Sequence, residues 1–225
     1  QLLRGFNKTL GASTQTSMMD FGLGLSFGNQ IARPKVTWGY NAALTYKNDT
    51  EFYQDAQFNL FAKPIDANQN ELEALQIQSG NYGVNSVLLG GIAGIALKTK
   101  ASKFKLNFLH LQNGESKSGI FDYENSNLGA NYEAKQYNLE YSQRGLTSIL
   151  LSGNHFLNGK AWEINWKLAP TRSTIEDPDI RFTRFRMPTN TISPEVGLPA
   201  RIWRNLEENN LVGKLDLTKN LSLWN

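Results

Sequence analysis

The stretch from Val84 to Leu111 constrains the fold more than any other part of the chain, because its residues alternate with period 2. In its second half, one side of an extended chain would carry Phe104, Leu106, Phe108 and His110, and the other Lys103, Lys105 and Asn107. The uncharged run from Val84 to Leu97 is shorter than the roughly 20 residues that a membrane-spanning helix needs. We therefore predict a β-hairpin that turns at Lys98–Ser102, with strands of at least the roughly 9–11 residues of a tilted membrane strand.

The same alternation recurs before and after this hairpin. From Met19 to Gly28, large apolar residues alternate with glycine and serine, a face too small to fill the core of a sandwich but suited to an occupied lumen. Val36–Lys47 alternates well beyond the roughly 5–6 residues of an average strand. Further along, Asn158-Gly159 is a strong signal for a tight hairpin that leads into the alternating strand at Trp162–Leu168.

Composition excludes several classes of protein. The chain has 225 residues, of which 40% are hydrophobic and 19% charged, and its mean hydropathy is −0.43, so it is no helical membrane protein. A membrane β-barrel is compatible with this average, because alternate strand residues face a polar lumen. The net charge is +3 without a dense basic stripe, so we expect no nucleic-acid partner. Without cysteine there are no disulfides, thiolate metal sites or cysteine catalysis.

Connections are expected to alternate between short turns and long polar loops. We place turns at 31–35, 98–102, 143–145 and 170–179, long loops at 48–83, 112–131 and 188–210, and one or two helical turns at Asn68–Leu75. The predicted fold class is all-β, part of a large antiparallel transmembrane β-barrel with about eight or nine strands present. We expect residues 1–225 to form one partial barrel domain, an internal fragment of a longer polypeptide, because the chain ends at Trp224-Asn225 before the last predicted strand meets a partner.

Most of the chain resembles the barrel of TonB-dependent outer-membrane receptors, in the branch with a carboxypeptidase-like regulatory domain. The segments that carry the resemblance are 6–11, 25–30, 39–53, 82–130, 137–146 and 173–185. The resemblance implies a 22-stranded barrel in the bacterial outer membrane that encloses a plug and actively imports a nutrient. The lipid bilayer, an inner-membrane energy-coupling protein acting through the plug, and a surface lipoprotein would be its partners. Neither the plug nor the energy-coupling segment is part of the 225 residues.

Candidate ligand contacts lie in the expected external loops. They are Asp122 and Tyr123, together with Arg201, Trp203 and Arg204, where an aromatic plane flanked by cations could stack on a sugar or bind a carboxylate. The residues expected to face lipid, with aromatic members near the membrane borders, are Phe21, Leu23, Leu25, Val36, Trp38, Tyr40, Leu44, Trp162 and Trp166.

No catalytic, metal or cofactor site is expected. The histidines, His110 and His155, have no acidic or cysteine partner at ligand spacing. The acidic run Glu176–Asp179 offers oxygens for calcium, but its proline favours a simple turn.

Three functions remain open at this stage. The leading hypothesis is a ligand-gated outer-membrane importer, which is not an enzyme. The alternative is a soluble or secreted β-sandwich that binds a ligand such as a carbohydrate, and a third is an outer-membrane enzyme or simple porin. A barrel would expose the apolar strand faces to lipid, whereas a sandwich would bury them.

Overall fold

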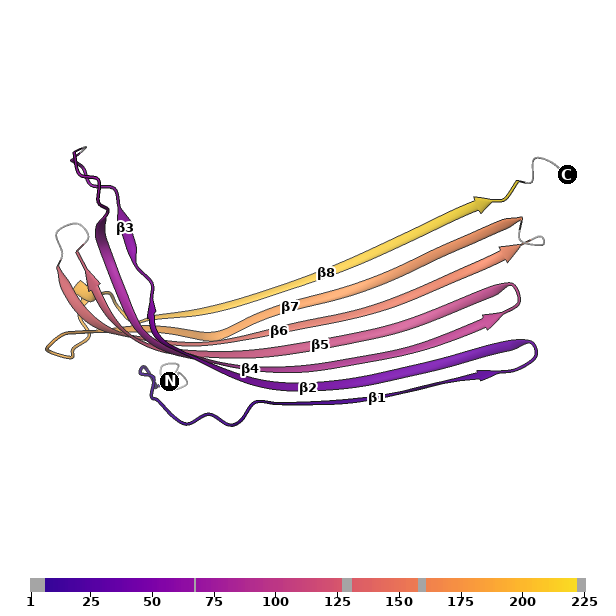
Figure 1. Ribbon diagram of the computed structural model, residues 1–225, viewed down its shortest axis with the longest axis horizontal. Helices are drawn as coiled ribbons and strands as arrows, with labels where there is room; N and C mark the ends of the chain where they lie inside the picture. Colours follow the sequence, from indigo (N-terminus) through magenta and orange to yellow (C-terminus); the bar gives the residue numbers. More distant parts are fainter. Residues whose placement is uncertain (1–6, 67, 127–130, 158–160, 222–225) are drawn as a thin grey trace, which may run out of the picture.

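The computed structural model describes residues 7–66, 68–126, 131–157 and 161–221, which form a single antiparallel sheet of eight strands (Figure 1). The order across the sheet is β1-β2-β4-β5-β6-β7-β8, and the short β3 pairs with β4. The strands are β1 (Phe21–Ala32), β2 (Val36–Gln57), β3 (Leu60–Ala62), β4 (Glu73–Thr99), β5 (Ser102–Asn125), β6 (Tyr132–Leu157), β7 (Trp162–Arg186) and β8 (Ala200–Lys219). The all-β, antiparallel prediction is confirmed. The sheet is open, with β1 and β8 at its edges.

Helical structure in the described part of the chain is limited to one 3₁₀ turn, η4 (Pro194–Val196). No helix there is long and apolar enough to cross a membrane. The helical turns expected at Asn68–Leu75 are wrong, since Glu73–Leu75 already belongs to β4.

Short and long connections fall at opposite ends of the sheet, as expected (Figure 1). Residues 33–35, 100–101 and 158–161 join consecutive strands at one end, which we call the short-turn end. Residues 58–72, 126–131 and 187–199 connect strands at the other, the long-loop end. Asn158-Gly159 lies outside the described residues, but the flanking pair Leu157–Trp162 places this connection at the short-turn end.

Two predicted turns are wrong, because residues 143–145 and 170–179 continue the strands β6 and β7. Irregular pairing explains the misleading sequence signals. The β6–β7 register shifts between Leu139 and Gln143, and the β7–β8 register shifts between Asp177 and Ile180, on either side of Pro178. Proline lacks an N–H for the ladder and is tolerated at such bulges. The predicted loops at 48–83 and 112–131 are likewise largely strand, because polar residues extend β2, β4 and β5, and the predicted loop 188–210 belongs to β8 from Ala200 onward.

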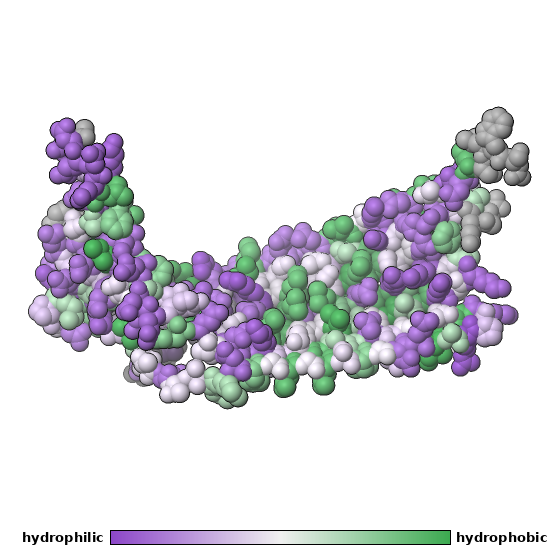
Figure 2. Space-filling view, in the orientation of Figure 1, coloured by the Kyte–Doolittle hydropathy of each residue, from purple (hydrophilic) through white to green (hydrophobic). Residues whose placement is uncertain are grey.

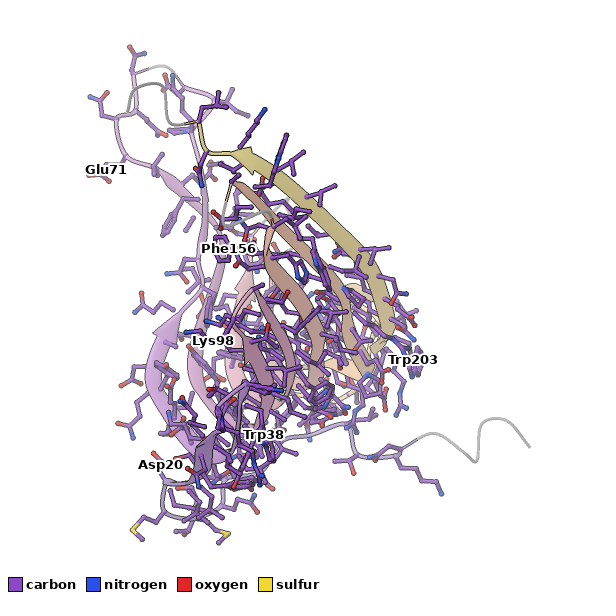
Figure 3. The ribbon with its side chains drawn as sticks, turned by 90° about the vertical axis from the view of Figure 1, so that its right-hand side faces the viewer. Asp20, Trp38, Glu71, Lys98, Phe156 and Trp203 are labelled. Atoms are coloured by element: carbon purple, nitrogen blue, oxygen red, sulfur yellow. The ribbon has the colours of Figure 1, made fainter. Side chains whose placement is uncertain are left out.

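Through most of its length the sheet has no core of its own. Among the described residues, the buried hydrophobic ones all lie towards the long-loop end, and they are Phe121, Tyr123, Ala134, Ile180 and Val196. Val196, from η4, packs beside Tyr123 and Ala134, so the β7–β8 connection folds back onto one face of the sheet. Figure 3 looks along the strands and shows the sheet as an arc, with Trp203 near its β8 edge.

Candidate functional site

An apolar belt covers one face of the sheet over the half nearest the short-turn end. The register places side chains from all seven long strands on this face, which we call the belt face. Its members include Phe21, Leu23, Leu25, Phe27, Trp38, Tyr40, Leu44, Leu89, Ile95, Leu97, Phe104, Leu106, Phe108, Ile149, Leu168, Leu211, Leu215 and Leu217, each at least 38% exposed. In Figure 2, hydrophobic residues gather over the middle of the strands and hydrophilic ones over the long-loop end. Exposed apolar surface of this extent marks an interaction with lipid or protein.

The belt is nearly as tall as the apolar band of a membrane barrel. On β2 it runs from Trp38 to Tyr46, which is about 27 Å along the strand at about 3.4 Å per residue, or about 22 Å along the belt normal at a strand tilt of about 35°. The apolar band of an outer-membrane barrel is about 25 Å tall. All nine residues expected to face lipid lie on the belt face in the registered pairs. Val36 and Trp162 are among them and lie beside the border of the belt at the short-turn end.

The belt is also slanted relative to the hydrogen bonds. On the side of the long-loop end, the belt ends at Phe21 on β1 and at Leu211 on β8. When the register is followed across the sheet from Phe21 and its partner Asn48, Leu211 lies about six residues nearer the short-turn end. Six residues are about 20 Å, and six strand spacings are about 29 Å, which gives a strand tilt of about 35° to the belt normal. Closed barrels need tilts of roughly 35–45°.

Aromatic side chains border the belt. Trp38, Phe104 and Trp166 share one register line near the short-turn end, while Phe21 and Tyr46 pack at the other border with ring centroids 5.6 Å apart. The Trp166 indole donates a hydrogen bond to His155 at 2.9 Å, and His155 contacts the Ser102 hydroxyl. Amphipathic rings with a polar partner are typical of a membrane interface.

The opposite face is polar at both ends and partly apolar at its middle, where apolar residues on β4–β6 alternate with Asn107, Asn113 and Ser148. Near the short-turn end it carries lysines and amides, among them Lys98, Lys105 and Asn154. At mid-height it carries a layer of apolar side chains, which are Leu88, Ile92, Leu109, Leu111, Leu146 and Leu150. Ile92 is 44% exposed. We call this set the apolar layer.

Towards the long-loop end, the opposite face carries aromatic and charged side chains that we call the rim cluster. The rings of Tyr53 and Tyr82 stack 4.6 Å apart, and Phe58 packs edge-on to Phe121 at 5.7 Å. Tyr53 and Phe58 are 41% and 51% exposed, so their rings are open to a ligand. The sequence analysis did not single out Tyr53, Phe58 and Tyr82, although a strand extension at Phe52–Leu60 was considered within the predicted loop 48–83, because the rings meet only through the pairing of β2 with β4.

Charged residues complete the rim cluster. Lys117 forms an ion pair with Glu115 at 2.9 Å and is the register partner of Glu140 on β6. Burial raises the pKa of Glu140, which lies beyond the belt, against the opposing effect of Lys117. Arg204 donates to the buried Asp177 at 2.7 Å. Hydrogen bonds from Ser142 and Arg204 lower the pKa of Asp177.

The predicted ligand contacts all lie towards the long-loop end, but on strands instead of loops. Asp122 and Tyr123 belong to β5, and Asp122 forms an ion pair with Lys135 at 3.2 Å. The ring of Tyr123 is buried under the Arg184 guanidinium at 4.0 Å.

The other three predicted contacts belong to β8 and do not form one site. Arg201 donates to Asp179 at 3.3 Å and to the carbonyl of Asn7. Trp203, on the belt face, is 52% exposed. Arg204 reaches the rim cluster through Asp177.

A calcium site at Glu176–Asp179 has no support, since Asp177 and Asp179 bind arginines. No group of three or more potential metal ligands occurs in the described ranges.

Comparison with known proteins gives no identification. No family model matches the chain, and neither a curated protein nor a solved structure matches it.

Proposed function

We propose that the strands cross the outer membrane of a bacterium as part of a β-barrel, and that the protein is a ligand-gated active importer of the TonB-dependent receptor type. The observation that carries the proposal is the exposed apolar belt, whose height and slant match those of a tilted membrane barrel wall. The resemblance in sequence supports the importer type. In this proposal β1 and β8 pair with further strands, because an open sheet edge is otherwise a site of aggregation.

The apolar layer supports an importer over a simple porin. A water-filled pore has a polar lining, whereas the opposite face carries leucines and an isoleucine at mid-height. Such a layer fits a lumen that is filled by a plug, through which an inner-membrane energy-coupling protein would act. The rim cluster, with its open aromatic rings and charged pairs, would then be the part of the wall that contacts the unidentified nutrient or a surface lipoprotein.

The soluble β-sandwich alternative requires a second layer over the belt. The described residues form one sheet, and the belt residues are exposed in them. This alternative would require the belt to be buried by another sheet.

Cell fractionation of the intact gene product tests the proposal. The membrane fraction is run on SDS gels with and without boiling. We expect the protein in the outer membrane, with faster mobility when unboiled because the closed barrel resists unfolding by the detergent. A soluble protein without a mobility shift would overturn the membrane assignment and leave the sandwich.

A further inference from the structure

A cleft of about 1150 Å³ lies on the belt face, beyond the belt towards the long-loop end. Its floor is formed by neighbouring strands through Asn48, Thr50, Asn85 and Ser118, which the register places on the same face as Leu44. Its other wall is the segment 12–18, which we call the strap. The volume exceeds the roughly 300–1,000 Å³ of typical small-molecule sites.

The strap is held against the sheet on both sides of the cleft. Before it, Arg181 donates to the carbonyl of Thr9 at 2.5 Å, and Arg201 donates to the carbonyl of Asn7. After it, the Asp20 carboxylate accepts the backbone N–H of Thr50 at 2.6 Å. Arg201 therefore serves to anchor the strap, which gives this predicted ligand residue a local structural role.

The lining is suited to a hydroxyl-rich ligand without negative charge. The strap contributes residues 13–17, which are serine, threonine and glutamine. The floor contributes amides and hydroxyls, and its charged residues are Asp122 and Lys135, which are paired to each other, Glu51, which accepts from the Tyr53 hydroxyl, and Asp55. Phe52, also on the lining, is 55% exposed and offers an open aromatic ring. Hydrogen-bonding side chains beside an aromatic plane can bind a sugar ring by its hydroxyls and its apolar face.

The position of the cleft indicates where this sugar comes from. On β4 the belt ends at Leu89, and the cleft residues Asn85 and Asn81 lie about 13 and 27 Å further along the strand. Phospholipid headgroups extend only about 5–8 Å beyond the hydrocarbon. A saccharide carried on a membrane lipid reaches further, so it can be anchored in the bilayer and still fill the cleft.

We infer that the cleft under the strap binds the saccharide headgroup of an outer-leaflet glycolipid. The inference rests on the proposed membrane location and adds a lipid partner on the belt face, separate from the rim cluster on the opposite face. The Asn85 amide, which donates to Asn48 at 3.1 Å and Thr50 at 3.0 Å, fixes the polar floor against which the sugar would lie.

The test uses the intact protein reconstituted in phosphatidylethanolamine vesicles and titrated with a neutral diacylglycerol glycolipid that carries a disaccharide headgroup. Binding is read by native mass spectrometry and by an affinity titration. Ser118→Trp fills the cleft and Phe52→Ala removes the aromatic plane. Both are expected to weaken binding about tenfold or more. Phe61→Ala, an exposed aromatic on β3 outside the cleft lining, is the matched control and is expected to keep wild-type affinity.

Each outcome is decisive. Equal binding by wild type and Ser118→Trp would overturn the inference, and so would binding of the free saccharide alone without preference for the lipid-linked form. A protein that inserts and shows the mobility shift but binds no neutral glycolipid would contradict this inference and leave the importer proposal unaffected. A protein that never inserts into the membrane would contradict the proposed function itself.

Discussion

At the scale of single residues, Arg204 matters through the carboxylate that it neutralises. Asp177 is 3% exposed and accepts from Arg204 at 2.7 Å, while the arginine side chain remains 66% exposed. Because solvent screens the exposed partner, Arg204→Ala should cost about 1–2 kcal/mol of unfolding free energy instead of the larger cost of a fully buried pair. Chemical denaturation of the intact protein in detergent measures it.

Lys214 and Asp216 provide the control on the same strand. They pair at 3.0 Å, but their side chains are 61% and 46% exposed. Lys214→Ala should therefore change stability by less than about 0.5 kcal/mol. Equal effects of the two alanine substitutions would show that burial of Asp177 does not decide the strength of its ion pair.

Glu140 makes the stability of the protein depend on pH, with a direction that follows from its raised pKa. Burial raises its pKa in the folded protein above the unfolded value, so the charged form is disfavoured in the folded state. The resulting penalty is present above the raised folded pKa and disappears as the pH falls to the unfolded value of about 4.3. Glu140→Gln should thus stabilise the protein at pH 7.5 and have little effect at pH 4. Denaturation midpoints at the two pH values test this, and a stabilisation that is independent of pH would contradict it.

At the scale of elements, the two faces of β2 should tolerate charge very differently. Leu44 lies in the belt and is 62% exposed, so Leu44→Arg would place a cation in lipid and cost about 2–4 kcal/mol near the bilayer midplane. Thr45 points to the opposite face, where its register partner Gly24 leaves open space, so the charge of Thr45→Arg stays out of the lipid and should cost less barrel stability than Leu44→Arg. Folding yield and stability in bilayer vesicles measure both. Equal stability of Leu44→Arg and wild type would count against both the barrel and the sandwich.

Strand identity was predictable where alternation is strict, as in Phe21–Gly28 and Trp162–Leu168. The two wrongly predicted turns came from composition. Gln143–Gly145 and the proline-containing run 170–179 have turn chemistry, yet the pairing continues past them because neighbouring strands hold the ladder on both sides. Long-range pairing of this kind overrides local propensity and cannot be read from one segment. The rim cluster was missed for the same reason, since Tyr53 and Tyr82 meet only through the β2–β4 register.

At the scale of the whole molecule, the apolar layer makes the opposite face unsuitable as the lining of an open channel. Ile92 and Leu109 are register partners at mid-height, level with the belt on the other side of the same strands. If a plug covers them, the intact protein should show little conductance in planar bilayers. Ile92→Arg would bury a charge at the contact with the plug, weaken it, and raise the frequency of channel openings several-fold.

Ser152→Arg is the control, because Ser152 lies on the same face in the polar region beside Lys105, where a further cation meets water or polar groups. Its conductance should stay close to that of the wild type, provided that both variants show the heat-dependent mobility shift of a closed barrel. A wild-type protein with large, steady conductance would contradict the occupied lumen and favour a simple porin. Unchanged conductance in Ile92→Arg would show that the apolar layer does not hold the plug, because a desolvated cation at a tight contact would weaken that contact.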